Sequence, residues 1–303
     1  MSVPPGTPDL GAPLVAALGA RCTFPPPTSG PVTCAVSGGA DSSALLVLAV
    51  AAGLRVTAVH VDHGLRPGSA DEADVVAALA ASLGASFRAE RVVVGDGPNL
   101  EARARAARQG AMPADALTGH TADDRAETVL LNLIRGAGPA GMAGIARSPR
   151  RPLLDLRRRE TAELCRVLGL EVIRDASNDD PRFRRNRVRH EVLALLADIG
   201  ERDPVPILVR QADRFADLDA LVASLAAEVD PTSASTLASL PAPVAGHAVR
   251  DWLVGAGVGD GHPPDSATVE RVLAVARGHA VAADLVAGWR VARTAGALRL
   301  EPR

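Results

Sequence analysis

Short apolar stretches alternate with helical patterns along the first part of the chain. The stretch VTCAV at residues 32–36 predicts a buried strand that runs directly into a helix. Further strands are expected at 55–61, around 90–94 and near 116–118, with helices at 70–83 and 100–109 between them. Strands that alternate with helices in this way predict an α/β fold with a parallel sheet covered by helices on both faces.

The pattern changes in the second half of the chain. Helices are expected at 122–135, at 157–168 and from about 186 through 196. Beyond about residue 206 the sequence is rich in alanine, its helical segments are interrupted by Pro and Gly, and residues 283–301 are expected to hold a few short strands. We therefore predict three parts, namely an N-terminal extension at 1–31, a domain built on the parallel sheet at 32–205, and a smaller, mainly helical domain at 206–303.

The segment SGGADS, residues 37–42, joins the first predicted strand to its helix. A helix start carries unpaired backbone N–H groups and a partial positive charge, and Gly38 and Gly39 let a ligand reach the backbone without meeting a Cβ atom. The segment therefore predicts a phosphate-binding loop. Its spacing differs from the dinucleotide fingerprint, and the GxxxxGK loop is excluded because all 33 basic residues are arginine. The structural alternative is a plain strand-to-helix turn with Asp41 or Ser42 in the first helical turn.

A second segment, GHTADDRAET, places several acids at the start of a predicted helix. Asp124 and Glu127 are three residues apart, and Asp123 and Glu127 are four apart, so the carboxylates share one helical face. Three acids beside His120 favour a cation-binding or metal-binding role. The structural alternative is a capping box formed by Thr121 and Asp124, in which acids in the first turn simply favour the helix dipole.

Three polar segments follow predicted strand ends, at 37–42, 60–63 and 119–124. In parallel sheets ligands bind at the carboxyl ends of the strands, where the strand order reverses, so we expect these segments to converge on one crevice. His60 and His63 are weak candidates for metal ligands, because a histidine at a strand end is more often a hydrogen-bonding wall of a pocket.

Composition and charge narrow the classes of function. The chain of 303 residues has a net charge of −2, 2% aromatic residues and no Tyr, so platforms for stacking nucleic-acid bases are scarce. Its three cysteines form no CxxC pair, which argues against a disulfide framework and a cysteine metal site and fits a reducing cytoplasm. We expect no signal peptide and no membrane span.

The arginines are unevenly distributed along the chain. Between residues 147 and 189 there are thirteen arginines and seven acids, whereas acids exceed arginines in the rest of the chain. This stretch is a candidate site for an anionic polymer, and a solvated surface that uses arginine in place of lysine explains it equally well.

Taken together, these segments resemble the tRNA(Ile)-lysidine synthetase family. SGGADS is similar to the SGGxDS loop of the wider superfamily of PP-loop ATP pyrophosphatases, which cleave ATP to AMP and pyrophosphate. HVDHGLRPGSADEA and NLEARARAAR also match, and the more specific likeness lies in GHTADDRAETVLLNLIRGAGPAGMAGI, RPLL and RDASNDDPRFRRNRVRHEVLALL. The likeness runs from about residue 32 to 197 and is weakest after 206. It implies a Rossmann-like PP-loop ATPase domain followed by a smaller helical domain that contacts tRNA.

The resemblance implies an ATP-dependent ligase of the cytoplasm. Such an enzyme adenylates O2 of the wobble cytidine of a minor isoleucine tRNA with a CAU anticodon. It then joins the ε-amine of lysine to C2, which gives lysidine, AMP and pyrophosphate. ATP and Mg2+ are therefore the expected cofactors, and tRNA(Ile) and lysine the expected partners. The oligomeric state stays open, with a homodimer among the options.

The site residues that the resemblance implies fall into four groups. The ATP phosphates would be held by Ser37, Gly38, Gly39, Ala40, Asp41 and Ser42, with Asp41 close to Mg2+. Asp124 and Glu127 would recognise the substrate lysine. The expected catalytic residues are Asp41, His120 and Glu127, and His120 or one of the acids would take the proton of the attacking amine. Phosphate or tRNA contacts are expected from Arg184, Arg185, Arg187 and Arg189.

Three other functions compete with this hypothesis. A PP-loop tRNA thiolase would also adenylate a base, but such enzymes usually need paired cysteines. The basic stretch argues against an amidating or NAD-forming ligase that acts on small molecules. A non-catalytic nucleotide-binding module would release no AMP in response to tRNA and lysine.

Overall fold

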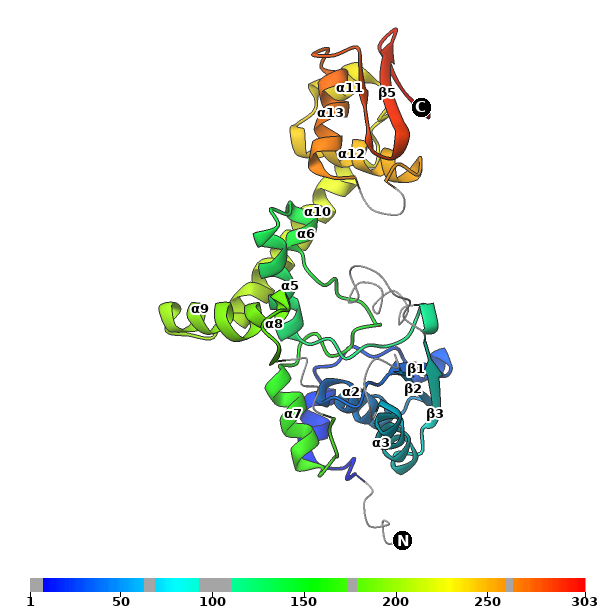
Figure 1. Cartoon of the computed structure of the whole chain (residues 1–303), viewed down its shortest axis with the longest axis vertical. Coiled ribbons are helices and arrows are strands. Elements are labelled where there is room, and N and C mark those ends of the chain that lie inside the picture. Colours follow the sequence, from blue (N-terminus) through cyan, green and yellow to red (C-terminus); the bar gives the residue numbers. More distant parts are fainter. Residues whose placement is uncertain (1–7, 63–68, 93–109, 174–178, 260–263, 303) are drawn as a thin grey trace. The chain divides into compact units, whose positions relative to one another are not determined.

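The computed structural model describes residues 8–62, 69–92, 110–173, 179–259 and 264–302. The chain divides into two compact units, Met1–Ala212 and Asp213–Arg303 (Figure 1). The division falls inside a long helix, α10 (Val205–Ala226), which starts close to the boundary predicted near residue 206. Proline is tolerated in the first turn of a helix, so Pro206 accompanies a helix start and does not mark a linker.

Unit 1 is built on a parallel sheet. Strand β2 (Val56–Asp62) lies between β1 (Val32–Ala35) and β3 (Ser86–Arg91). On the other edge of β1, Leu117 forms a parallel bridge with Cys34, held by backbone hydrogen bonds of 2.8 and 2.9 Å. The strand order therefore reverses at β1, which is where ligands bind in open α/β sheets. The predicted α/β fold with a parallel sheet is confirmed.

The third strand begins earlier than predicted. The apolar run VVV predicts a strand around 90–94, but the ladder between β2 and β3 begins at the pair Thr57–Ser86. All side chains of β3 are partly or fully exposed, so this edge strand lacks the apolar run by which a buried strand is recognised. The strand predicted near 116–118 is present only as the Leu117 bridge, and the helix predicted at 100–109 lies outside the described residues.

Helix α2 (Ala40–Ala51) follows β1 and occupies the centre of unit 1. Its residues 42–49 are all buried, and it contacts β1, β2, α1 (Pro13–Gly19) and α7 (Arg158–Val167). A helix that is apolar on every side is buried on every side, and here it gives the loop at its N-terminus a rigid support. Helix α1 belongs to the same core through Val15 and Leu18, so this part of the predicted extension is integral to unit 1.

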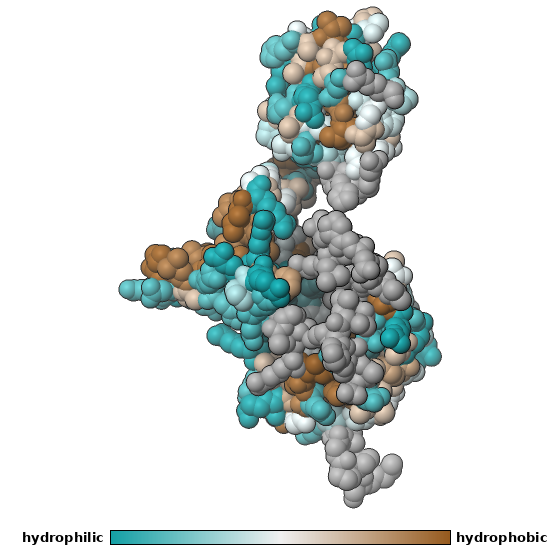
Figure 2. All heavy atoms as spheres, viewed as in Figure 1, coloured by the Kyte–Doolittle hydropathy of each residue, from teal (hydrophilic) through white to brown (hydrophobic). Residues whose placement is uncertain are grey.

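The remaining helices of unit 1 lie close to their predicted positions, except the short α6, which the sequence did not predict. They are α3 (Ser69–Ser82), α5 (Ala122–Ile134), the short α6 (Pro139–Met142), α8 (Arg184–Arg187), the π-helical turn η3 (Val188–Val192) and α9 (Leu193–Gly200). The helix predicted from about 186 is thus a succession of three segments. Figure 2 shows apolar residues gathered over α9, where Leu195 and Ile199 are exposed.

Unit 2 contains the C-terminal part of α10, further helices and a small antiparallel sheet against which α13 packs. The helices are α11 (Ala234–Ser239), α12 (Ala242–Gly255) and α13 (Ser266–Ala276), and the strands are β4 (Ala282–Asp284), β5 (Trp289–Thr294) and β6 (Ala297–Pro302). The strands expected within 283–301 are present, and unit 2 is therefore mixed α/β where the sequence predicts a mainly helical domain. Within the described ranges, no helix has the length and apolar character needed to cross a membrane.

Candidate active site

The loop between β1 and α2 is closed by its own hydroxyl groups. The Ser37 N–H donates to Ser42 Oγ at 3.1 Å, and Ser42 Oγ donates to the Gly39 carbonyl at 2.9 Å. Gly38 has a φ of +83°, in the left-handed region that favours glycine. Gly39 is the N-cap of α2 and makes no side-chain cap, so the helix start presents backbone N–H groups. The loop has the form of an anion cradle at a helix N-terminus.

Two distant segments pack directly against this loop. The Ile173 N–H donates to the Gly38 carbonyl at 3.0 Å, and a Cβ atom on Gly38 would lie 2.1 Å from Ile173 Cδ1. A Cβ atom on Gly119 would lie 2.8 Å from the Asp41 carbonyl oxygen. The start of the GHTADDRAET segment therefore lies against the first turn of α2, and these two predicted segments do converge.

His60, in the third segment, is part of the wall behind the loop. It is buried, and its Nδ1 lies 3.0 Å from the carbonyl oxygen of Val36, the residue that precedes the loop. This supports the interpretation of His60 as a hydrogen-bonding wall. His63 lies outside the described residues.

Asp41, in the first turn of α2, contacts α7. Its carboxylate accepts a hydrogen bond from Thr161 Oγ1 and lies 3.5 Å from Arg158 Nε. Burial raises the pKa of Asp41 to about 6, and the contacts with Thr161 and Arg158 offset only part of this rise.

The first turn of α5 carries the predicted capping box. Asp124 Oδ2 accepts hydrogen bonds from the Thr121 N–H at 2.9 Å and from Thr121 Oγ1 at 3.0 Å. Its other oxygen, Oδ1, accepts from Arg158 Nη2 at 3.0 Å. Burial alone would raise the pKa of Asp124, but Arg158 and the Thr121 N–H outweigh it and hold the pKa below its usual value. Asp124 therefore both caps the helix and contacts a cation, and the cation is an arginine of the chain itself.

Glu127 is fully buried and bound by three arginines. Its Oε1 accepts from Arg158 Nη1 at 2.9 Å and Arg189 Nε at 2.8 Å, and its Oε2 accepts from Arg185 Nε at 3.0 Å and Arg189 Nη2 at 3.3 Å. Four hydrogen bonds fill the acceptor capacity of a carboxylate. A substrate ammonium would reach Glu127 only by displacing one of these guanidinium groups.

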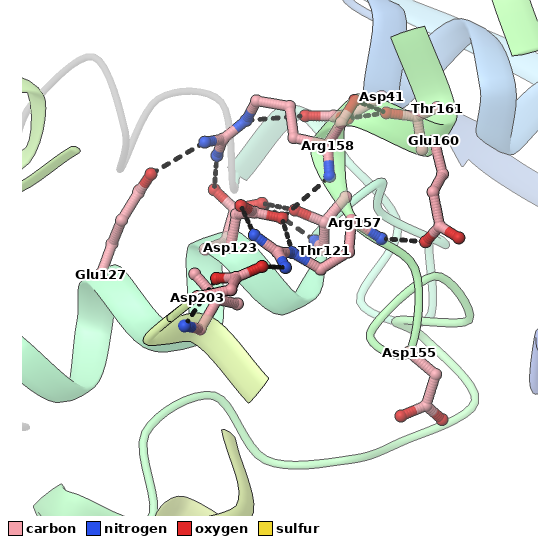
Figure 3. A network of polar contacts seen from close by, with 12 residues as sticks. Asp41, Thr121, Asp123, Glu127, Asp155, Arg157, Arg158, Glu160, Thr161 and Asp203 are labelled. Carbon is pink, nitrogen blue, oxygen red and sulfur yellow. Dashed lines mark hydrogen bonds and ion pairs between the residues drawn. The ribbon is translucent and has the colours of Figure 1, made fainter. Parts of the chain in front are cut away.

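Asp123 fixes the start of α7. It accepts hydrogen bonds from Arg157 Nε at 3.0 Å and from the backbone N–H of Arg158 at 2.8 Å, while Arg157 also pairs with Asp203. Arg158 therefore stands at an anchored helix start, and its side chain contacts Asp41, Asp124 and Glu127. Figure 3 shows Arg158 between Asp41 and Glu127, with a dashed line to each.

The four arginines expected to contact phosphates or RNA divide into two pairs. Arg185 and Arg189 turn inward to Glu127. Arg184 and Arg187 are exposed, and Arg187 forms an ion pair of 2.8 Å with Glu191.

Much of the basic stretch is neutralised within the chain. Further ion pairs join Arg147 to Asp155, Arg166 to Glu163 and Arg182 to Asp180. The cationic surface is therefore smaller than the count of thirteen arginines suggests.

His120 stands immediately before the N-cap of α5. Its Nδ1 lies 2.8 Å from Thr118 Oγ1, and that hydroxyl donates to the Arg150 carbonyl at 3.3 Å. Thr118 therefore fixes the orientation of the His120 imidazole.

Comparisons with known proteins identify the family to which this phosphate-binding loop and its surroundings belong. A family model described as a PP-loop domain matches residues 20–196. The tRNA(Ile)-lysidine synthase of Nocardia farcinica is 44% identical over 242 residues, which cover 75% of this chain and 76% of the relative. The enzyme of that name from Thermobifida fusca is 39% identical over 288 residues, which cover 87% and 86%. This chain belongs to the tRNA(Ile)-lysidine synthase family.

A solved PP-loop structure shares the fold. The U34-tRNA thiolase of Methanococcus maripaludis superposes with a TM-score of 0.54 at 17% identity and covers 67% of this chain and 80% of its own. That thiolase was solved with a 4Fe–4S cluster. In this member of the lysidine synthase family all three cysteines are free, and burial raises the pKa of Cys34 to about 12 and of Cys165 to about 11. Across the described residues no group of three His, Cys, Asp or Glu side chains could hold a metal ion.

Sequence reasoning missed two side chains of this lysidine synthase site, Arg158 and Thr161. Both lie on α7 and contact Asp41. Their spacing of three residues places them on one face of the predicted helix, which is the signal that the sequence offers. Arg158 stands between two other arginines, however, and nothing local distinguishes the one that turns toward the acids.

Proposed function

We propose that this chain is an ATP-dependent carbon–nitrogen ligase that converts the wobble cytidine of a tRNA(Ile) with a CAU anticodon to lysidine. Membership of the tRNA(Ile)-lysidine synthase family supports this activity. The observation that carries the proposal is the juxtaposition of an anion cradle, at the point where the strand order reverses, with the first two turns of α5, which carry three acids.

In the first step, cytidine O2 attacks the α-phosphorus of ATP and the bond to the β-phosphate oxygen breaks. Pyrophosphate leaves and the base carries an adenylate ester. Negative charge grows on the phosphate oxygens, and the N–H groups at the start of α2 and the guanidinium group of Arg158 would stabilise it. The residues fit the use of Mg2+, which binds through one or two carboxylates together with substrate phosphates, because Asp41 is a single carboxylate beside the cradle. Bound there, Mg2+ would neutralise phosphate charge.

In the second step, the ε-amine of lysine attacks C2, the C2–O2 bond breaks and AMP leaves. A lysine amine has a pKa near ~10.4, so only about one molecule in a thousand is neutral near pH 7 and a proton acceptor is needed. We assign this role to His120, because Thr118 fixes its imidazole directly before the N-cap of α5 and the acids of that helix. Asp124 and Glu127 would orient the ammonium group. The four hydrogen bonds to Glu127 make it a less suitable proton acceptor than His120.

The exposed Arg184 and Arg187 are the proposed contacts for the anticodon loop. The target base lies in a single-stranded loop, so no duplex has to open and contacts with phosphates suffice for docking. Residues 213–303 contain eight arginines and eleven acids, which gives no charge-based support for the predicted contact between unit 2 and tRNA. That contact, a cytoplasmic location and a homodimer stay predictions.

The test is incorporation of lysine into RNA. The protein is incubated with ATP, radiolabelled lysine and minor isoleucine tRNA, and label in RNA, AMP and pyrophosphate are followed. We expect all three products in equal amounts and none with Asp41→Ala. AMP release without label in the RNA would point to another adenylating enzyme, such as a thiolase.

A second experiment separates the two steps. His120→Gln should still release pyrophosphate on mixing with ATP and tRNA, while single-turnover transfer of lysine slows at least ~100-fold, within the range of general base catalysis. Unchanged transfer would remove His120 from the second step.

A further inference from the structure

Asp124 and Glu127, the acids proposed to orient lysine, contact the same guanidinium group as Asp41, which lies in the first turn of α2 after the phosphate-binding loop. Arg158 contacts Glu127 at 2.9 Å, Asp124 at 3.0 Å and Asp41 at 3.5 Å. Asp41 lies in the first turn of α2, so the guanidinium group of Arg158 spans from the loop to the acidic turn of α5. Its backbone is held by Asp123, whereas its side chain remains 27% exposed.

The charges of this cluster cancel. Asp41, Asp124 and Glu127 are matched by the guanidinium groups of Arg158, Arg185 and Arg189. A lysine ammonium that enters this cluster gains no net attraction and meets repulsion from Arg158. The triphosphate of ATP, bound at the cradle, would add negative charge on the Asp41 side of Arg158. It would draw the guanidinium group away from Asp124 and Glu127.

We propose that Arg158 couples the binding of ATP to the binding of lysine. In the absence of nucleotide Arg158 neutralises the lysine-orienting acids. When ATP binds, Arg158 turns toward the phosphates and the acids become available to the ammonium group. This inference rests on the proposed function, and it predicts that ATP binds before lysine.

The experiment measures lysine binding by equilibrium dialysis with radiolabelled lysine, with and without α,β-methylene-ATP and Mg2+. This analogue cannot be cleaved between the α- and β-phosphates, so binding is observed without chemistry. For the unmodified chain we expect the analogue to strengthen lysine binding at least ~10-fold, a usual size of coupling between two sites. Lysine should strengthen binding of the analogue by the same factor, because coupling is reciprocal. Equal lysine affinity in the two conditions would overturn the proposal.

Variants at Arg158 separate coupling from a purely structural role. Arg158→Gln should bind lysine several-fold more tightly than the unmodified chain when no nucleotide is present, and the analogue should change that affinity less than ~2-fold. A structural role predicts the opposite sign, namely weaker lysine binding in the variant. Arg166→Ala is the matched control, because Arg166 lies on the same helix, is exposed and pairs only with Glu163 among the described residues. It should keep the full coupling.

The outcomes distinguish this inference from the proposed function. If lysine enters tRNA but its affinity does not depend on the analogue, the ligase activity stands and the coupling is wrong. If lysine neither binds nor enters tRNA under any condition, both proposals fail. Should Arg158→Gln not fold, the two measurements on the unmodified chain still decide the question.

Discussion

The loop at 37–42 and the first turn of α5 are both helix starts, but they are stabilised in different ways. The glycine turn of the loop is held mainly by neutral hydrogen bonds among Ser37, Gly39 and Ser42, and the partners from distant segments are the Ile173 N–H on Gly38 and the α7 side chains on Asp41. The acids of α5 that follow its start, Asp124 and then Glu127, are held mainly by charged partners from distant parts of the chain, and Glu127 is 31 residues from Arg158 and 62 from Arg189.

This difference predicts which kind of substitution disturbs each region. A loop with local, neutral hydrogen bonds is disturbed mainly by steric changes in the backbone that surrounds it. A buried turn with ionic partners is disturbed by any change in charge, because an unpaired charge in the interior is costly.

Glu127→Gln should give the largest loss of stability. The substitution leaves three guanidinium groups facing a neutral amide that brings N–H donors among their own. Breaking a buried ion pair by removing one partner costs about 3–5 kcal/mol, so we expect a loss of that size in the free energy of unfolding, measured by urea titration. Glu163→Gln is the control, because Glu163 is exposed and pairs only with the exposed Arg166 among the described residues. Equal stability of the two variants would contradict the contrast.

Gly119→Ala should disturb the loop without changing any charge. The new Cβ atom would lie 2.8 Å from the backbone oxygen of Asp41, and backbone cannot move aside as a side chain can. Overpacking of this kind costs about 1–3 kcal/mol, and we expect ATP to bind at least ~10-fold more weakly in calorimetry. Gly19→Ala, whose Cβ atom would meet no atom within 4 Å, should bind ATP normally. Normal ATP binding by Gly119→Ala would show that the loop tolerates a shift of its neighbour.

Asp124→Asn should lower stability in a way that depends on pH. The folded-state pKa of Asp124 lies below its ordinary value of 3.8, so its stabilising contribution is complete above that value and is lost as the pH falls through the folded-state pKa. We expect the variant to be about 1–2 kcal/mol less stable at pH 7, as for a lost cap or charged hydrogen bond. The difference should shrink below a pH of about 4. Urea midpoints at neutral and acidic pH measure it, and a difference independent of pH would assign the effect to the cap alone.

Arg184→Ala should have the smallest effect on folding and a measurable effect on RNA. Arg184 is exposed, so stability should not change, while each phosphate contact that is lost should make the salt dependence of tRNA binding shallower by about one unit of slope. Arg185→Ala should instead lose stability, because Arg185 binds Glu127. An unchanged salt slope for Arg184→Ala would place the RNA contact elsewhere.

The same contrast explains what could be predicted from the sequence. The glycine loop, the helices α5 and α7 and the capping box of Thr121 and Asp124 follow from neighbouring residues, and the structure contains them. The acids of α5 could be recognised as a cation site, but the cations could not be named. Glu127 meets Arg158, Arg185 and Arg189 only because segments distant in the sequence pack against α5. The residues next to each arginine do not predict that packing.

The arginines around Asp124 and Glu127 also give a practical advantage to anyone studying the site by spectroscopy. The chain contains no lysine, so every guanidinium group in this cluster is chemically unlike the ε-ammonium of the proposed substrate. Isotopically labelled lysine added to the protein would supply the only ε-ammonium resonance in a nuclear magnetic resonance spectrum. Its protonation could then be followed directly in the bound state, without background from the polypeptide.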